Sequence, residues 1–421
     1  MATAEAFSSP VPSDGAVRFL GHEAPYWRLR IKGAVYVLLT LGIYRFWLAT
    51  DVRRYLWSNT EIAGETLEYN GLATELLVGF LLALAILVPL YMVVAIGALE
   101  LGVVAVTAIL MVLPLVALLA EFALYRARRY RLTRTVFRGV RFNQRGSAWH
   151  YALIGFAWWI VVLLTAGLAY PWAKASLQRF KLRNTSYGDL PGRFEATGSA
   201  LFLRGVALWG LVFAPLVIGI VAFGAMTDWI AVNDILAKGD DNAFTQVAQN
   251  SGFRHASWVG LAGIGVSVLA AVLLYPVFQA IKLRWWMSGL RFGEVVVTSQ
   301  LRASQVYRVY LRFILHVLLF TLAASVVGVV GLAAVGMLLG AAHDSNPAEL
   351  MATVILVVLY VVSVLGVSTI YQVTVTAAMW RLSAQSADLS GAQALETVRA
   401  AGAPISALGE GLADALRVGG I

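Results

Sequence analysis

The chain of 421 residues contains no cysteine, so it forms no disulfide and has no thiolate for metal binding or nucleophilic catalysis. Histidine is scarce as well, and the five histidines show no HExxH motif and no other paired metal-binding spacing. They are His22, His150, His255, His316 and His343. A Ser-His-Asp order, a glycine-rich phosphate loop and a paired-carboxylate motif are also missing. We therefore predict a protein that is not an enzyme and that uses no cofactor or metal.

Charged residues are few: they make up 13% of the chain, whereas soluble proteins average about 25%. Hydrophobic residues reach 60%, and this excess predicts a surface that faces lipid. The net charge of +9 would suggest nucleic-acid binding in a soluble protein. Here the lysines and arginines stand at the ends of hydrophobic runs, as topology signals and contacts with anionic lipids do. We expect membrane lipids, and no nucleic acid, as partners.

Long hydrophobic runs dominate the middle of the chain, and a helix needs about 20 apolar residues to cross the bilayer core. Six stretches reach this length: 74–96, 101–124, 200–226, 256–280, 310–342 and 350–380. Residues 33–49, interrupted by Arg45, and residues 149–173 resemble each other at an offset of 125 positions. Residues 1–25 lack the basic and apolar regions of a cleavable signal, so we expect a polar N-terminal tail. Residues 381–421, rich in Ala, Gly and Ser, are predicted to be a C-terminal tail.

One cassette recurs along the chain: a hydrophobic stretch, a basic-aromatic cluster, a polar segment and another hydrophobic stretch. Its first two copies align without a gap 75 positions apart. Arg53-Arg54-Tyr55 aligns with Arg128-Arg129-Tyr130, Thr60 with Thr135, Gly64 with Gly139, and Gly71 with Gly146. Looser copies surround Gln178-Arg179-Phe180 and the segment from Lys282 to Gly293. We place the repeats at about 33–96, 101–173, 149–226 and 256–342.

The polar segments, 59–71 and 134–146 in the first two copies, alternate loosely around a central glycine, which is typical of short β-hairpins. Exposed hairpin backbone is excluded from hydrocarbon, so the hairpins should lie at the level of the lipid headgroups. The predicted fold is an all-α polytopic membrane protein over residues 26–380. It has 6–8 hydrophobic helices in repeated helix-hairpin units with short interfacial β-hairpins.

Two membrane arrangements fit the hydrophobic runs. If residues 33–49 and 149–173 dip in and return, nearly all lysines and arginines outside the spans share one face with both termini. The opposite face then holds only Lys238 and Arg254. This arrangement fits the positive-inside rule and is preferred. If both segments cross instead, the two halves of the chain have opposite orientations, as in transporters with inverted repeats.

The motif LLTLGIYRFW at residues 38–47, followed by RRYLWSNTEIAGETLEYNG at residues 53–71, resembles the signature of the YjgN-like family of bacterial inner-membrane proteins. The resemblance covers residues 17–380. Phe46 stands where the family usually has proline, whereas the second copy keeps Pro171 before Trp172. The resemblance implies a multi-pass protein of the cytoplasmic membrane. It implies no activity, cofactor or catalytic residue.

Basic residues of the cassettes are candidate contacts for lipid headgroups, because each arginine or lysine near an anionic surface contributes about 1 kcal/mol. These are Arg53, Arg54, Arg128, Arg129, Arg131, Arg134, Arg179, Lys181, Lys282 and Arg284. An equal alternative is that they serve only as topology signals. Glu121 and His316 lie inside hydrophobic stretches and are the candidate intramembrane polar site. Their more ordinary roles are an interfacial carboxylate paired with nearby arginines, and a histidine bonded to a neighbouring helix.

Two functions follow from these features. The first is a multi-pass inner-membrane protein without enzymatic activity, whose basic interfacial face contacts anionic lipids or partner proteins, including further copies of this chain. The second is a transporter or channel for a lipidic or weakly polar solute. The internal duplication and the prolines within the hydrophobic stretches favour it.

Overall fold

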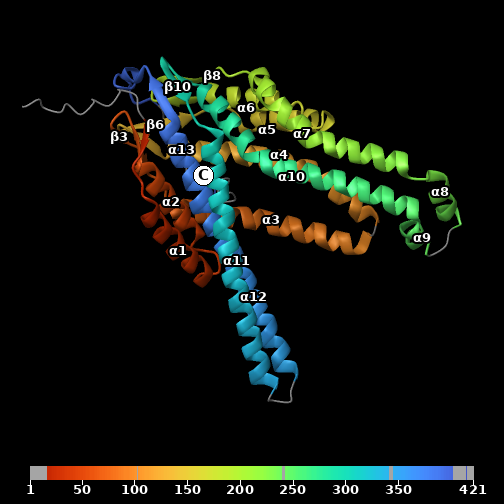
Figure 1. Cartoon of the computed structure of the whole chain (residues 1–421). Helices are drawn as coiled ribbons and strands as arrows, with labels where there is room; N and C mark the ends of the chain where they lie inside the picture. The colour runs from red at the N-terminus through yellow and green to blue at the C-terminus, as the bar shows by residue number, and fades with distance from the viewer. Residues whose placement is uncertain (1–16, 102, 239–241, 341–344, 402–413, 415–421) are drawn as a thin grey trace, which may run out of the picture.

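The computed structural model describes residues 17–101, 103–238, 242–340, 345–401 and 414. The chain is mostly helical, with its strands gathered at one end and long helices leading away from them (Figure 1). The helices are α1 (Glu23–Leu39), α2 (Arg45–Ser58), α3 (Ala73–Leu101), α4 (Val103–Thr133), α5 (Ala148–Leu164), α6 (Tyr170–Arg183), α7 (Gly198–Met226), α8 (Trp229–Ala237), α9 (Ala243–Gln249), α10 (Ser251–Ser288), α11 (Ala303–Gly340), α12 (Ser345–Tyr371) and α13 (Ala378–Ser386). A π-helical turn at Gln372–Ala377 joins α12 to α13, and a 3-10 turn covers Ala392–Leu395.

The strands form one hairpin in each cassette copy, with a further short strand, β4, after the first hairpin, and one strand before and one after the four copies. They are β1 (Val17–Phe19), β2 (Thr60–Ile62), β3 (Glu65–Thr66), β4 (Glu68–Tyr69), β5 (Thr135–Phe137), β6 (Val140–Gln144), β7 (Thr185–Tyr187), β8 (Leu190–Phe194), β9 (Leu290–Phe292), β10 (Val295–Ser299) and β11 (Ala387–Ser390). The first two hairpins turn at Ala63-Gly64 and Arg138-Gly139, where all four residues have positive φ. Type I′ turns require this conformation at both central residues.

The hairpins do not stay separate. The strands from β4 to β11 form one antiparallel sheet of eight strands in sequence order, in which a strand of each copy pairs with the hairpin of the next copy. The register places Tyr69 opposite Thr135, and Gln144 opposite Thr185. Because β3 pairs with β2 and β4 pairs with β5, the segment 65–69 links this sheet to the smaller sheet β1-β2-β3. The all-α prediction therefore needs correction, since the hairpins build a continuous sheet.

Neither residues 33–49 nor residues 149–173 form a single continuous helix, because each chain segment folds back on itself. α1 and α2 are joined by a turn in which Leu41 and Gly42 have φ of 50° and 95°. Ala166 and Gly167 have φ of 48° and 88° at the equivalent turn between α5 and α6. In both turns a threonine hydroxyl donates to the carbonyl four residues earlier, at 2.7 Å for Thr40 and 2.8 Å for Thr165. The repeated sequence thus encodes the same helical hairpin twice.

The long helices run in pairs: α3 with α4, α7 with α10, and α11 with α12 (Figure 1). Within the described residues, four helical segments are long and apolar enough to cross a membrane. They are Gly198–Met226, Ser251–Ser288, Ala303–Ala334 and Leu350–Ser386. α3 and α4 contain 29 and 31 residues, respectively. Large apolar side chains are exposed along the long helices, which suits contact with lipid.

Glycines bring α7 and α10 close together. A Cβ at Gly263 would lie 2.7 Å from Gly219 Cα, and the Ser267 hydroxyl donates to Val212 O at 2.7 Å. Small residues allow such close backbone approach between membrane helices. At Gly336, by contrast, a Cβ would meet nothing within 4 Å, although this residue begins a GxxxG motif. The close approach of the two helices therefore lies at Gly219 and Gly263, which the GxxxG motif at Gly336 does not indicate.

The main core lies between the sheet and the helices α1, α2 and α13. Every hairpin contributes to it, through Tyr69, Phe137, Tyr187 and Val295 among others. Leu395 is buried in the same core, and β11 forms the last strand of the large sheet. Residues 387–395 are therefore folded onto the body, within the region that composition predicts to be a tail. The weakly amphipathic segment 404–418 lies outside the described residues except at Asp414.

Candidate functional site

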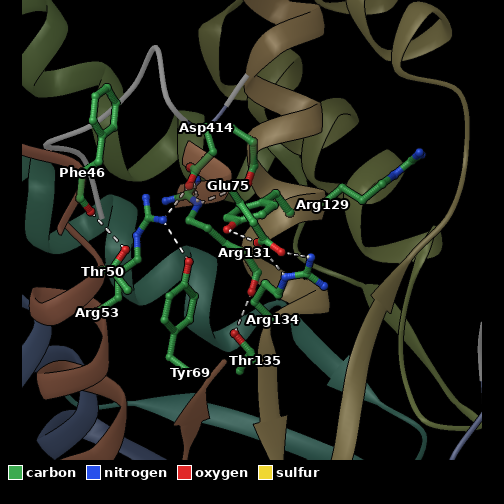
Figure 2. A network of polar contacts seen from close by, with 12 residues as sticks. Phe46, Thr50, Arg53, Tyr69, Glu75, Arg129, Arg131, Arg134, Thr135 and Asp414 are labelled. Atoms are coloured by element: carbon green, nitrogen blue, oxygen red, sulfur yellow. Dashed lines mark hydrogen bonds and ion pairs between the residues drawn. The ribbon is translucent and has the colours of Figure 1, made fainter. Parts of the chain in front are cut away.

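Among the ion pairs of the described residues, the most deeply buried joins Arg53 of α2 to Asp414 (Figure 2). Their side chains expose 3% and 1% of their surface, and Arg53 Nη1 lies 2.5 Å from Asp414 Oδ2. The same nitrogen donates to the Tyr69 hydroxyl at 3.0 Å. Burial disfavours the charged guanidinium, but the Asp414 carboxylate and Tyr69 outweigh it and raise the pKa of Arg53 above its ordinary value. Arg53 thus stays charged although its side chain is almost fully buried.

The second copy repeats this arrangement without a described carboxylate at the guanidinium. Arg128 Nη1 donates to Gln144 Oε1 at 2.7 Å, and Gln144 follows Arg128 by 16 positions, just as Tyr69 follows Arg53. The next arginine of each copy also repeats its contact. Arg54 Nη2 donates to Gly71 O at 3.2 Å, and Arg129 Nη2 donates to Gly146 O, each 17 positions ahead. The duplicated arginine pair therefore has a repeated structural role, which is to tie each helix end to its own hairpin.

A conserved spacing within the repeats places one threonine at the start of the first strand of three hairpins. Each hydroxyl donates to the carbonyl four residues earlier and also accepts a hydrogen bond from a side chain outside its own copy, from another copy for Thr135 and Thr185 and from α13 for Thr60. These acceptor contacts are Trp380 Nε1 to Thr60 Oγ1 at 2.9 Å, Trp57 Nε1 to Thr135 Oγ1 at 2.9 Å, and Arg128 Nη1 to Thr185 Oγ1 at 3.0 Å. The threonines thus join the copies to one another and to α13, in addition to their contacts at the ends of the helices.

Arg131 and Arg134 also turn toward the interior of this network (Figure 2). Arg131 Nε lies 3.5 Å from Asp414 Oδ1. Arg134 forms an ion pair with Glu75 at 2.8 Å, and Glu75 Oε2 also accepts a hydrogen bond from the Tyr130 hydroxyl at 2.7 Å. Despite partial burial, the Glu75 carboxylate raises the pKa of Arg134 above its ordinary value. Glu75 is the first-turn acid of α3, so this cluster joins the start of α3 to the end of α4.

The remaining predicted basic residues are placed differently. Arg179 on α6 is exposed, Arg284 on α10 is partly buried, and the ammonium of Lys181 lies 5.1 Å from the centre of the Tyr151 ring. Lys282 lines a groove beside α7. The ten predicted headgroup contacts therefore divide between an internal network around Arg53 and positions nearer the surface.

Several arginines outside the predicted set are exposed at the ends of helices nearest the sheet. Arg145 precedes α5, Arg204 lies in the second turn of α7, and Arg302 and Arg308 flank the start of α11. None of the four forms an ion pair with a described residue. The signal that marks these residues is their position within a few residues of a helix start.

Glu121 lies on α4 and is buried against α5. Its Oε1 accepts a hydrogen bond from Trp159 Nε1 at 2.9 Å. Gly155 makes this contact feasible, since a Cβ there would lie 3.2 Å from Glu121 Cδ. In the part of the chain that is described, no arginine forms an ion pair with Glu121. A tryptophan donor thus occupies the place of the arginine partners that the sequence suggested.

His316 lies on α11, on a different helix pair from Glu121, so the two do not form a joint site. Its Nδ1 is 2.7 Å from Arg312 O, and its ring stacks on Trp27 of α1 with centroids 6.1 Å apart. It lines a pocket of about 440 Å³ between α1, α11 and α12 that is otherwise apolar, with Phe320 and Leu365 in its wall. The structure thus gives His316 the backbone and packing contacts of a structural residue.

Two features of the site were not predicted from the sequence. Asp414 lies in a segment of mostly small and apolar residues, and an acid that is buried in such surroundings needs a partner. Tyr69 and Gln144 share the offset of 75 positions that relates the repeats, so extending the alignment would have paired them with Arg53 and Arg128. Among the described residues, no group of three acidic or histidine side chains could hold a metal ion.

Comparison with known proteins bears on the family alone. No curated protein and no solved structure matches the chain significantly. A family model described as a bacterial protein of unknown function (DUF898) matches residues 14–250, more than half of the 421 residues. This range includes both helical hairpins, α1–α2 and α5–α6, and three of the four strand hairpins. The chain therefore belongs to DUF898, the YjgN-like family of bacterial proteins of unknown function, as its LLTLGIYRFW motif indicated.

Proposed function

We propose that this chain is a multi-pass protein of the bacterial inner membrane, without enzymatic activity, whose basic interfacial face contacts anionic lipids or partner proteins. The observation that carries the proposal is the eight-stranded sheet. Hydrogen bonds join strands of all four cassette copies in this sheet, so these strands lie on one side of any membrane that the helices cross. Each long helix pair then leaves this side and returns to it, which gives six spans.

The helical hairpins α1–α2 and α5–α6 support the same arrangement. Both arms of α5–α6 connect to strands of the large sheet, β6 and β7, and these two strands pair with each other. The segment therefore enters and returns on the sheet side. The loop between α7 and α10, with Lys238 at the end of α8, lies at the far end of that helix pair (Figure 1). This arrangement is the one that the positive-inside rule favours.

Exposed arginines at the sheet side support the proposed contact of this face with anionic lipids. Arg145, Arg204, Arg302 and Arg308 are exposed near helix starts, where they reach the headgroup level beside apolar surface. Basic residues at this depth attract anionic lipids at about 1 kcal/mol each, and salt weakens the attraction. The transporter or channel alternative gains no supporting feature from the residues that the structure describes.

The test is lipid enrichment around the protein. The chain is extracted in polymer nanodiscs from membranes of mixed phosphatidylglycerol and phosphatidylcholine, and the co-extracted lipids are quantified by mass spectrometry. We expect enrichment of phosphatidylglycerol that falls in the variant with Arg145, Arg204, Arg302 and Arg308 all changed to Gln. A control with Lys238→Gln and Arg254→Gln on the far side should keep it. Equal enrichment in the wild type and the fourfold variant would contradict the proposal.

A further inference from the structure

The pocket of about 440 Å³ between α1 and the helix pair α11–α12 has a mainly apolar wall that includes Ile31 and Val35. Among its described lining residues there is no Asp, Glu, Lys or Arg, and the side chains with polar atoms are His316, Thr369 and Trp27. The volume is that of a small-molecule site, and an unpaired charge would be costly in such surroundings. The pocket therefore suits an uncharged and mainly apolar ligand.

The two helical hairpins differ at a position that borders this pocket. At the offset of 125 positions, Ala34 of α1 corresponds to Trp159 of α5. Trp159 Nε1 donates to Glu121 Oε1 at 2.9 Å, whereas Ala34 lines the pocket. The second hairpin thus carries a large side chain with a hydrogen-bond partner at the position where the first carries a small one beside open space.

Ion pairs mark the rim of the pocket nearest to the sheet. Glu23 Oε1 lies 3.4 Å from Arg312 Nη1 and 3.5 Å from Arg381 Nη1. Trp27 and His316 follow Glu23 and Arg312 by four residues each, which is about one helical turn, or about 6 Å. In the membrane arrangement proposed above, these ion pairs lie at the headgroup level. The polar groups of the pocket then lie just inside the hydrocarbon edge, and its apolar wall continues beyond them.

His316 and Thr369 retain hydrogen-bonding capacity toward the pocket. His316 Nδ1 lies 2.7 Å from the carbonyl oxygen of Arg312, which can only accept, so Nδ1 carries the proton and Nε2 of the neutral ring is an acceptor. Within the described part of the chain, neither His316 Nε2 nor the Thr369 hydroxyl has a hydrogen-bond partner. Both side chains line the same pocket, so a ligand there meets one acceptor and one hydroxyl.

These two side chains also stand at the same level on neighbouring helices. α11 and α12 pack against each other in antiparallel directions, and the rings of Phe313 and Tyr371 lie 5.6 Å apart. His316 is three residues after Phe313, and Thr369 is two residues before Tyr371. Both therefore lie on the side of this ring contact that faces away from the sheet. A single hydroxyl group placed between them would donate to one and accept from the other.

We propose that this pocket binds one uncharged lipid that carries a single hydroxyl group on an apolar body, of the isoprenoid-alcohol type. Its hydroxyl donates to His316 Nε2 and accepts from the Thr369 hydroxyl, and its apolar chain runs along α1 toward Leu38. The proposal rests on the membrane location proposed above. An acyl chain of a bulk phospholipid also fits the space but satisfies neither polar group, so the pocket must distinguish a hydroxyl ligand from a purely apolar one.

Competition binding in nanodiscs tests the role of the hydroxyl. The chain is labelled with a photoreactive farnesol analogue, and unlabelled farnesol or farnesyl methyl ether competes. The ether keeps the apolar body and an acceptor oxygen but cannot donate a hydrogen bond. Farnesol should compete about fivefold better than the ether, which is the contribution of one hydrogen bond. In His316→Phe this preference should vanish, because the new ring can still stack on Trp27 but offers no acceptor.

Thr369→Val should have a different effect from His316→Phe. It should weaken both competitors about fivefold and keep the preference for farnesol, because alcohol and ether alike accept from the Thr369 hydroxyl. Thr321→Val is the matched control, since the Thr321 hydroxyl donates to Val317 O at 2.9 Å and Thr321 does not line the pocket. It should change neither value. Use of the same two competitors in every variant cancels their different partitioning into the bilayer.

A steric variant keeps the test independent of hydrogen bonding. Ala34→Trp introduces the residue that the second hairpin carries at the equivalent position, and it should abolish saturable labelling. Gly331→Trp on α11, where a Cβ would meet nothing within 4 Å, should keep it. Equal competition by farnesol and its ether in the wild type would overturn the proposal. So would a preference that survives His316→Phe, or saturable labelling that Ala34→Trp leaves unchanged.

The enrichment of phosphatidylglycerol around the protein, measured in parallel, separates this proposal from the proposed function. Where enrichment is present without a preference for the hydroxyl ligand, the basic face stands and the pocket proposal fails. The variant with Arg145, Arg204, Arg302 and Arg308 changed to Gln should lose the enrichment and keep the hydroxyl preference, because none of these arginines lines the pocket.

Discussion

Arg53 and Asp414 are 361 positions apart in the chain, yet their side chains meet at 2.5 Å beneath the sheet. The pair joins the first cassette copy to the C-terminal region. Arg131 of the second copy reaches the same carboxylate at 3.5 Å. One carboxylate, that of Asp414, therefore forms ion pairs with arginines of two copies.

Removing Asp414 should strongly destabilise the fold. Asp414→Asn leaves the guanidinium of Arg53 charged and buried, and breaking such a pair costs about 3–5 kcal/mol. The measurement is the free energy of unfolding in detergent, from denaturant titration. Glu65→Gln is the matched control, because Glu65 also pairs with an arginine, at 3.2 Å, but its side chain is 55% exposed. That exposed pair should contribute less than about 1 kcal/mol. Similar small losses for both variants would show that the buried pair is unimportant.

Stability should fall at alkaline pH because of buried tyrosines in the sheet. Burial raises the pKa of Tyr187 to about 12, and its hydroxyl donates to Phe137 O at 2.9 Å. In the unfolded chain, the pKa of a tyrosine is about 10. The folded state thus holds its proton more tightly, so the contribution is complete below pH 10 and is lost as the pH rises toward 12.

Melting temperatures measured from pH 8 to pH 12 check this prediction. Tyr187→Phe removes one titrating group, so its melting temperature should decline less steeply across that range than that of the wild type. Tyr69 retains a raised pKa through burial, so some decline should remain. A wild-type curve that is flat between pH 10 and pH 12 would count against the buried, neutral state of these tyrosines.

The crossing of α7 and α10 should tolerate no side chain at Gly263. A Cβ there would lie 2.7 Å from both Gly219 Cα and Pro215 O, whereas one at Gly265 would meet nothing within 4 Å. Gly263→Leu should therefore destabilise the protein by about 1–3 kcal/mol through overpacking, and Gly265→Leu by less than about 0.5 kcal/mol. Thermal stability in detergent distinguishes the two. Equal effects would mean that the helices do not approach closely at this point.

Local patterns predicted much of this architecture. The sequence predicted the hydrophobic helices, the hairpin turns at glycine and the equivalence of Thr40 and Thr165. Each of these features is determined by residues only a few positions apart. Pairing between hairpins was not predicted, since any two hairpins with alternating residues can pair and only the arrangement of helices selects the partner. The role of Arg53 was missed for a related reason. An arginine at the end of an apolar run is expected to be a surface cation unless its partner is known. The partner of Arg53 is Asp414, which is too distant in the sequence to be recognised.

Cysteine accessibility tests the central claim most directly, because the native chain contains no thiol. The hairpin glycines have positive φ and suit substitution poorly, so exposed neighbours are better sites. Single Glu68→Cys, Arg141→Cys, Arg193→Cys and Thr298→Cys variants are compared with Lys238→Cys in intact cells and in inverted membrane vesicles, using an impermeant maleimide. We predict labelling of the first four from the same side and of Lys238→Cys from the other. Labelling of Arg141→Cys and Arg193→Cys from opposite sides would contradict the account, because it would mean that α5–α6 crosses the membrane.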